Sequence, residues 1–202
     1  MKRMITTLGL ALALALSVGA AGVLAHDGGS DGGGGSDDSV TTCQPPTTGG
    51  AVREEHGSGS SGNDDMEGTE TGDSEHGEGG DDVIDGRGGD DDLSGEAGDD
   101  DICGDDGDDT VAGGLGNDNI AGGRGDDDLN GGRGDDVVAG QRGRDDVTGG
   151  RGNDLLLGGR ADDTIHARDD RVDRIDCGSG NDTVRADSDD KVARNCEHVS
   201  RS

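Results

Sequence analysis

A nine-residue repeat runs without slippage from residue 77 to residue 166. Ten units fit this range: the first position is Gly in all ten, the fourth is Gly in nine, the sixth is always Asp, and the eighth is always Ile, Leu or Val. The unit at 77–85 reads GEGGDDVID, and the unit at 113–121 reads GGLGNDNIA. Disordered low-complexity sequence has no need to keep an aliphatic residue in fixed phase. The period therefore predicts a repeated structural unit that stacks on its neighbours.

Each unit divides into a turn and a short strand. Glycine at the first and fourth positions allows positive φ and close backbone approach, so six residues can make a tight turn. The last three residues form a strand whose middle, aliphatic side chain points to the opposite face from its two neighbours. The resulting core is one aliphatic column per side. The chain has no Phe, Tyr or Trp, which excludes the large aromatic-filled core of a Rossmann fold or a TIM barrel.

The charge balance decides which partners the chain can have. The sequence carries 47 acidic residues against 17 Lys and Arg, for a net charge of -30. This balance disfavours nucleic acid and anionic membranes as partners, because both need clustered basic residues. Stacking would bring the sixth-position carboxylates about 4.8 Å apart, where like charges repel by about 1 kcal/mol even in water. Cations between them would remove this repulsion, and hard oxygen ligands suit calcium.

The pattern G-G-x-G-x-D-x-U-x resembles the calcium-binding nonapeptide of RTX (haemolysin-type) proteins over 77–166, and more weakly over 59–76. The resemblance implies an all-β fold: a parallel β-roll, or right-handed β-solenoid, with two nonapeptides per coil and no order without calcium. It also implies calcium held between successive turns by sixth-position carboxylates and turn carbonyls. The candidate ligands are the sixth-position residues Asp82, Asp91, Asp100, Asp109, Asp118, Asp127, Asp136, Asp145, Asp154 and Asp163, and the fourth-position residues Gly80, Gly89, Gly98, Gly107, Gly116, Gly125, Gly134, Gly143 and Gly152.

The N-terminal region predicts export. Residues 1–25 read as a cleaved signal peptide, with Lys2 and Arg3 ahead of an apolar run and small residues before the cut. Residues 26–58 have the Gly, Ser, Thr and Asp content of a flexible linker. Residues 59–76 form two degenerate repeats, in which Glu75 fills one aliphatic slot. We therefore expect a secreted, extracellular protein.

The C-terminal region, residues 167–202, departs from the strict period. It keeps the Asp-x-aliphatic pairing at Asp173, Asp182 and Asp190, with Asp173 and Asp182 offset by one residue from the main array. We interpret it as a C-terminal cap of the roll.

Four cysteines allow three disulfide pairings in an oxidising compartment. Cys177 and Cys196 close a short loop near the C-terminus and are the favoured pair, whereas Cys43 and Cys103 either pair with each other or stay free. No C-x-x-C spacing supports a zinc site.

The motifs point to binding instead of catalysis. The sequence has no Ser-His-Asp set, nucleophile elbow, H-E-x-x-H or phosphate loop, so we expect no enzyme. We expect a secreted calcium-binding protein that folds on binding calcium. The alternative is an adhesin or matrix protein that uses the roll as a calcium-rigidified spacer, with an unidentified protein or polysaccharide partner.

One further column is basic. Arg fills the third position of five consecutive units, and either compensates the acidic rows or forms a stripe for an anionic polymer. These residues are Arg124, Arg133, Arg142, Arg151 and Arg160.

Overall fold

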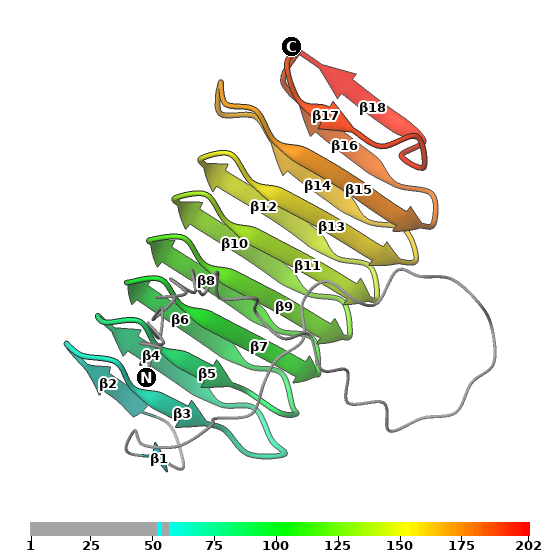
Figure 1. The fold of residues 1–202 in the computed structure, drawn as a ribbon. Coiled ribbons are helices and arrows are strands. Elements are labelled where there is room, and N and C mark those ends of the chain that lie inside the picture. Colours follow the sequence, from blue (N-terminus) through cyan, green and yellow to red (C-terminus); the bar gives the residue numbers. More distant parts are fainter. Residues whose placement is uncertain (1–51, 54–56) are drawn as a thin grey trace, which may run out of the picture.

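The computed structural model describes residues 52–53 and 57–202, so the predicted signal peptide and Cys43 lie outside the described residues. The chain winds into a roll with two parallel nine-stranded sheets, and each coil adds one strand to each sheet (Figure 1). Sheet A contains, in spatial order, β1 (Val52–Arg53), β3 (Asp65–Glu67), β5 (Val83–Asp85), β7 (Asp101–Asp106), β9 (Asn119–Arg124), β11 (Val137–Arg142), β13 (Leu155–Arg160), β15 (Arg174–Ser179) and β17 (Lys191–Val192). Sheet B contains β2 (Gly57–Ser60), β4 (Ser74–Glu78), β6 (Asp92–Ala97), β8 (Thr110–Leu115), β10 (Asp128–Arg133), β12 (Asp146–Arg151), β14 (Thr164–Ala167), β16 (Thr183–Ala186) and β18 (His198–Arg201).

The strand register confirms the parallel β-roll. Val138 of β11 pairs with Ile120 of β9 on one side and with Leu156 of β13 on the other. Each of these steps is 18 residues, so one coil takes two nonapeptides, one for each sheet. No helix in the described part of the chain is long and apolar enough to cross a membrane.

The eighth-position side chains form the core, as the repeat predicts. They point between the two sheets and are at most 2 % exposed, from the N-terminal coils to β16. The column in sheet A is Met66, Ile84, Ile102, Ile120, Val138, Leu156 and Ile175, and the column in sheet B is Leu93, Val111, Leu129, Val147, Ile165 and Val184. One eighth-position residue per strand therefore fills most of the interior of the roll. In β4 this residue is the buried Glu75, and Ala167, Cys177 and Ala186 complete the core near the C-terminal coils.

The fourth-position glycines provide the tight turns. Gly98 has φ +144° and Gly116 has φ +137°, a region that only glycine enters easily. A Cβ atom on Gly116 would also overlap the carbonyl oxygen of Gly98 in the preceding coil. The turns thus stack backbone on backbone. Ala161, the one replacement, holds φ +85°.

The sheets extend beyond the strict repeat at both ends. They begin at Val52, inside the range 26–58 predicted as a linker, and the residues after 166 add β15 and β17 to sheet A and β16 and β18 to sheet B. The one-residue offset is absorbed in the loop 168–173, and Leu156 still pairs with Ile175, now 19 residues away. The predicted cap is therefore built from further coils.

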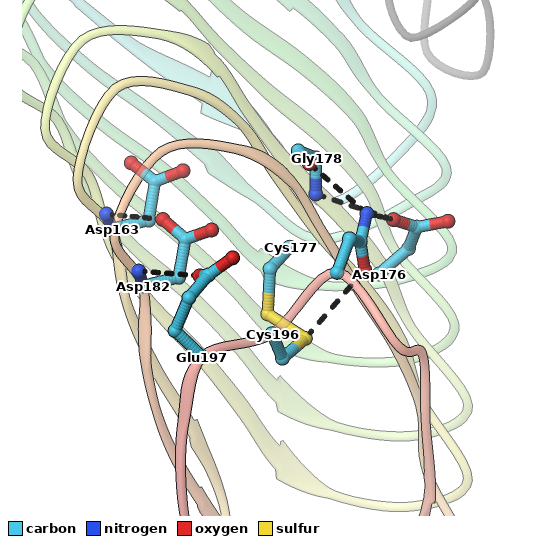
Figure 2. The surroundings of a disulfide bond; sticks show 8 residues. Asp163, Asp176, Cys177, Gly178, Asp182, Cys196 and Glu197 are labelled. Atoms are coloured by element: carbon cyan, nitrogen blue, oxygen red, sulfur yellow. Dashed lines mark hydrogen bonds between the residues drawn. A yellow bond between two sulfur atoms is a disulfide. The ribbon is translucent and has the colours of Figure 1, made fainter.

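Cys177 of β15 forms a disulfide with Cys196, which follows β17 (Figure 2). Their Cα atoms lie 5.3 Å apart, and Cys177 is fully buried. Cys103 of β7 is also disulfide-bonded, and its partner lies outside the described residues. No described cysteine is a free thiol.

Candidate metal centre

Two ladders of acidic side chains run along the roll, one at the turns that lead into sheet A and the other at the turns that lead into sheet B. In the first ladder the backbone N–H of Asp100 donates to Oδ1 of Asp118 at 3.0 Å, and that of Asp118 donates to Oδ1 of Asp136 at 2.9 Å. Every rung repeats this bond one coil further on. The first ladder is Asp64, Asp82, Asp100, Asp118, Asp136, Asp154, Asp173 and Asp190. The second is Asp73, Asp91, Asp109, Asp127, Asp145, Asp163, Asp182 and Glu197.

The second oxygen of these carboxylates is buried without a protein partner. Asp118 and Asp136 are at most 2 % exposed, and within the described residues no hydrogen bond reaches Oδ2 of either. The Oδ2 atoms of all ten predicted aspartates and of Asp173 and Asp182 are likewise buried without a hydrogen bond. Because an unpaired buried carboxylate oxygen costs free energy, rows of them indicate positions for cations.

A backbone carbonyl lies near several of the orphaned oxygens. A Cβ atom on Gly131 would lie 2.5 Å from both Oδ2 of Asp136 and the carbonyl oxygen of Gly149 in the next coil. Among the described residues, no three His, Cys, Asp or Glu side chains converge on one point. An ion must therefore take part of its ligands from the backbone. Carboxylate and carbonyl oxygens are the donors that calcium prefers, so the residues present fit this metal.

The fourth-position glycines offer a second set of carbonyls. Their N–H groups are used: that of Gly98 donates to the carbonyl of Leu115 at 2.8 Å, and that of Gly116 to the carbonyl of Arg133 at 2.9 Å. Their carbonyl oxygens accept no backbone hydrogen bond in the described turns of the repeat. The predicted glycines thus lie in the same turns as the ladders, with oxygens left for a ligand.

Burial controls the protonation of the ladders. Desolvation, followed by the charge of neighbouring carboxylates, raises the pKa of Asp118, Asp127 and Asp145 to about 7. The backbone N–H bond to Oδ1 opposes this rise but does not cancel it. In the absence of a cation, the folded roll favours protonated carboxylates.

Acidification should therefore partly replace calcium. Between about pH 7 and about pH 4 the folded, metal-free roll binds more protons than the unfolded chain, because its pKa values are raised, so its stability increases as pH falls through this range. We expect far-UV circular dichroism of the chelated protein to regain β signal near pH 5 and to lose it above pH 7. An equally unstructured metal-free chain at both values would contradict this expectation. The calcium-loaded protein is the control and should respond in the opposite direction, since protons compete with the metal.

The fifth-position side chains form further hydrogen bonds between coils, and the sequence predicted no role for them. The N–H of Asn117 donates to Oδ1 of Asp99 at 2.8 Å, and that of Asp135 donates to Oδ1 of Asn117 at 2.9 Å. In these bonds the accepting side chain belongs to the preceding coil, whereas in the sixth-position ladders it belongs to the following coil. The signal was present, because nine of the ten units have Asp or Asn at the fifth position. Arg144 is the exception; its guanidinium offers no acceptor and instead pairs with Asp126 at 2.6 Å.

The ladders also contain acidic residues beyond the ten predicted candidates. Asp64 and Asp73 precede the strict repeat, and Asp173, Asp182 and Asp190 follow it. Glu197 closes the second ladder by accepting the N–H of Asp182 at 3.0 Å, beside the Cys177–Cys196 disulfide (Figure 2). Its sequence signal was an acidic residue two positions before Val199, the same spacing as in the repeat.

The comparisons with known proteins agree with this geometry. No curated protein matches the chain. The family described as RTX calcium-binding nonapeptide repeat matches in four copies, at residues 67–102, 76–111, 104–138 and 139–171. These stretches contain all ten sixth-position aspartates and span more than half of the sequence. Repeat, register and acidic ladders thus lead to one conclusion: the chain belongs to the RTX calcium-binding nonapeptide repeat family.

Proposed function

We propose that this protein is a secreted, non-catalytic calcium-binding protein whose roll folds when calcium binds. The observation that carries the proposal is the pair of buried carboxylate rows with orphaned Oδ2 atoms. A polypeptide gains nothing from such rows unless a cation neutralises them. The acidic residues of the repeat are occupied in this architecture, which supports a binding role over catalysis.

The ions occupy the gaps between successive turns along each ladder. On the sheet A side, Asp100, Asp118 and their ladder neighbours supply carboxylate oxygens, and the turn glycines supply carbonyl oxygens. Calcium accepts six to eight oxygen ligands in flexible geometry, which suits a mixture of side-chain and backbone donors. The same arrangement repeats on the sheet B side with Asp109, Asp127 and their neighbours.

Folding and export are linked through the calcium concentration. Without metal, repulsion along both ladders opposes a core of one aliphatic residue per strand, so the chain stays expanded. Extracellular calcium modules commonly bind at about 10⁻⁴–10⁻³ M, and each bound ion adds stability by mass action. A chain carrying the predicted signal peptide at 1–25 would therefore fold after it leaves the cell.

The variant Asp118→Asn tests the ligand assignment. An Asn side chain keeps an oxygen that can accept the N–H of Asp100, but it replaces the orphaned oxygen with an amide nitrogen, which is a hydrogen-bond donor and does not ligate calcium. We expect the calcium concentration at half-maximal folding, followed by circular dichroism, to rise several-fold.

The matched control is Asp128→Asn, which makes the same charge change at an exposed position of β10. It should leave the midpoint close to that of the unmodified protein. Equal midpoints for the two variants would mean that net charge, and not ligation, sets the calcium response.

A further inference from the structure

Two turns near the start of the roll satisfy their ladder carboxylates without a cation. The N–H of Ser60 donates to Oδ2 of Asp64 at 2.6 Å, and the Ser60 hydroxyl donates to the same atom at 2.8 Å. In the next turn, the N–H and the hydroxyl of Thr69 donate to Oδ2 of Asp73 at 2.6 Å and 3.0 Å. In the ten strict units, by contrast, Oδ2 of the sixth-position Asp is buried without a hydrogen bond. We call the turns 59–64 and 68–73 closed turns, and those of the ten strict units open turns.

The two kinds of turn also differ in backbone conformation. Ser60 and Thr69 occupy the second position of their nine-residue units, four residues before the ladder aspartate. The second residue has positive φ in all ten open turns, with values from 69° to 116°, and in neither closed turn. The second residues of the open turns are Glu78, Arg87, Glu96, Asp105, Gly114, Gly123, Gly132, Gln141, Gly150 and Gly159. An orphaned carboxylate oxygen thus accompanies a left-handed second residue.

The identity of the second residue biases this conformation. Five of the ten left-handed residues carry a side chain, and Glu96 and Gln141 hold φ at 69° and 73°. A side chain disfavours this region, so such residues persist only where the surrounding structure holds them. Threonine is especially unsuited to it, because its branched Cβ makes positive φ an outlier. A serine or threonine at this position also supplies a hydroxyl that can reach the carboxylate.

The donors of a closed turn occupy the place that a cation would need. A carboxylate oxygen has about two lone-pair sites, and the N–H and hydroxyl of Ser60 use both on Oδ2 of Asp64. The oxygens around this atom are otherwise those of an open turn. A Cβ atom on Gly59 would lie 2.9 Å from Oδ2 of Asp64 and 2.6 Å from the carbonyl oxygen of Gly77, the same pair of groups that lies beside Gly131. The second residue therefore distinguishes the two turns, and the acidic residue does not.

Both forms of the turn fit the same stack of coils. In the closed turn, the carbonyl of Ser60 accepts the N–H of Gly79 in the next coil at 3.2 Å. In an open turn, the carbonyl of Arg87 accepts the N–H of Asp106 at the equivalent position, at 3.0 Å. A change at the second position can therefore alter the state of the carboxylate while the hydrogen bond between coils is kept.

We propose that the second residue of each unit decides whether its turn binds calcium, and that Ser60 and Thr69 exclude the ion from the two closed turns. Ligation of calcium then begins at Asp82 in the first ladder and at Asp91 in the second. The inference rests on the calcium binding proposed above and names the turns that take part. The first ladder ends in a similar way, because Oδ2 of its last rung, Asp190, accepts the N–H of Asp187 at 2.6 Å.

Equilibrium dialysis of the protein against saturating calcium, with magnesium in excess to displace weakly bound ions, counts the calcium bound per chain. Asp64→Asn should leave the count unchanged, because the carboxylate of Asp64 binds no ion. Asp82→Asn, the same change one coil further along the first ladder, should lower the count. Circular dichroism in calcium checks that each variant folds.

Exchange of the second residue should convert one kind of turn into the other. Ser60→Gly frees Oδ2 of Asp64 and permits positive φ, so it should raise the count by about one ion per chain. Its matched control, Ser61→Gly, should not. Gln141→Thr should lower the count by closing the turn at Asp145, whereas Gln141→Asn should not, because Asn tolerates the left-handed region. If Gln141→Thr does not fold, the pair Glu96→Thr and Glu96→Asn replaces it.

Two results would overturn this inference alone. In a protein that binds calcium normally, equal losses from Asp64→Asn and Asp82→Asn would show that the closed turns also bind the ion. A count that Ser60→Gly leaves unchanged would show that the second residue does not control access. An unmodified protein that binds no calcium would instead overturn the proposed function, and this inference with it.

Discussion

Removal of calcium with a chelator should unfold the roll completely and cooperatively. We expect loss of the β signal in circular dichroism and an increase of the radius of gyration to about 48 Å, the value for an unfolded chain of 202 residues. The reason is the acidic ladders: burial raises the pKa of Asp127 and Asp163 to about 7, so their ionised forms are held in the folded roll at a cost in free energy. No described basic side chain bonds to these buried oxygens.

Magnesium is the control for this experiment, because it screens charge as calcium does but demands near-octahedral geometry and keeps its waters. At equal ionic strength, magnesium should leave the chelated chain expanded. Refolding by magnesium or by sodium chloride alone would show that general screening stabilises the roll. Small-angle scattering across the titration would distinguish the two outcomes.

Truncation of a core residue should have the second largest effect. Leu129→Ala removes a side chain that is fully buried between Val111 and Val147 in the sheet B column. Such substitutions cost about 2–5 kcal/mol, since the cavity closes only partly. With one aliphatic residue per strand, no second layer can move into the space. In saturating calcium we expect the Tm to fall by about 10 °C.

Leu115→Ala is the matched control for the core. Leu115 belongs to the neighbouring strand β8 but is 51 % exposed. Thermal unfolding of this variant should follow that of the unmodified protein closely. A comparable loss at both positions would mean that Leu115 also contributes to packing.

The repeat predicted most of this architecture because its period fixes both the spacing of the strands along the chain and the face on which each side chain lies. A residue such as Ile120 occurs every nine positions, so its burial follows from the period alone. The continuation of the sheets past residue 166 was harder to predict, because the ladder bond from Asp154 to Asp173 spans 19 residues and breaks the count. The coils still stack in register, because the extra residue is accommodated in the loop 168–173.

Hydrogen bonding between coils was the other feature that the sequence analysis did not predict. The fifth-position residues Asp99 and Asn117 are exposed, and exposed acidic or amide residues usually indicate no more than solubility. Their role depends on a backbone N–H that lies 18 residues away and becomes a neighbour only after coiling. Glu197 was missed for a related reason, because it serves the second ladder from a segment that has lost the glycines of the repeat.

The ladder bonds have a direction with consequences for how the protein is made. Each sixth-position N–H is satisfied by a carboxylate from the following coil, so Asp163 depends on Asp182, and Asp182 on Glu197. Synthesis begins at the N-terminus, so the coil that supplies each carboxylate is made after the coil that needs it. Each coil therefore lacks the carboxylate acceptor for its sixth-position N–H until the next coil has been made. The bond from Asp182 can form only after Glu197 has been made, so the second ladder is completed late in synthesis.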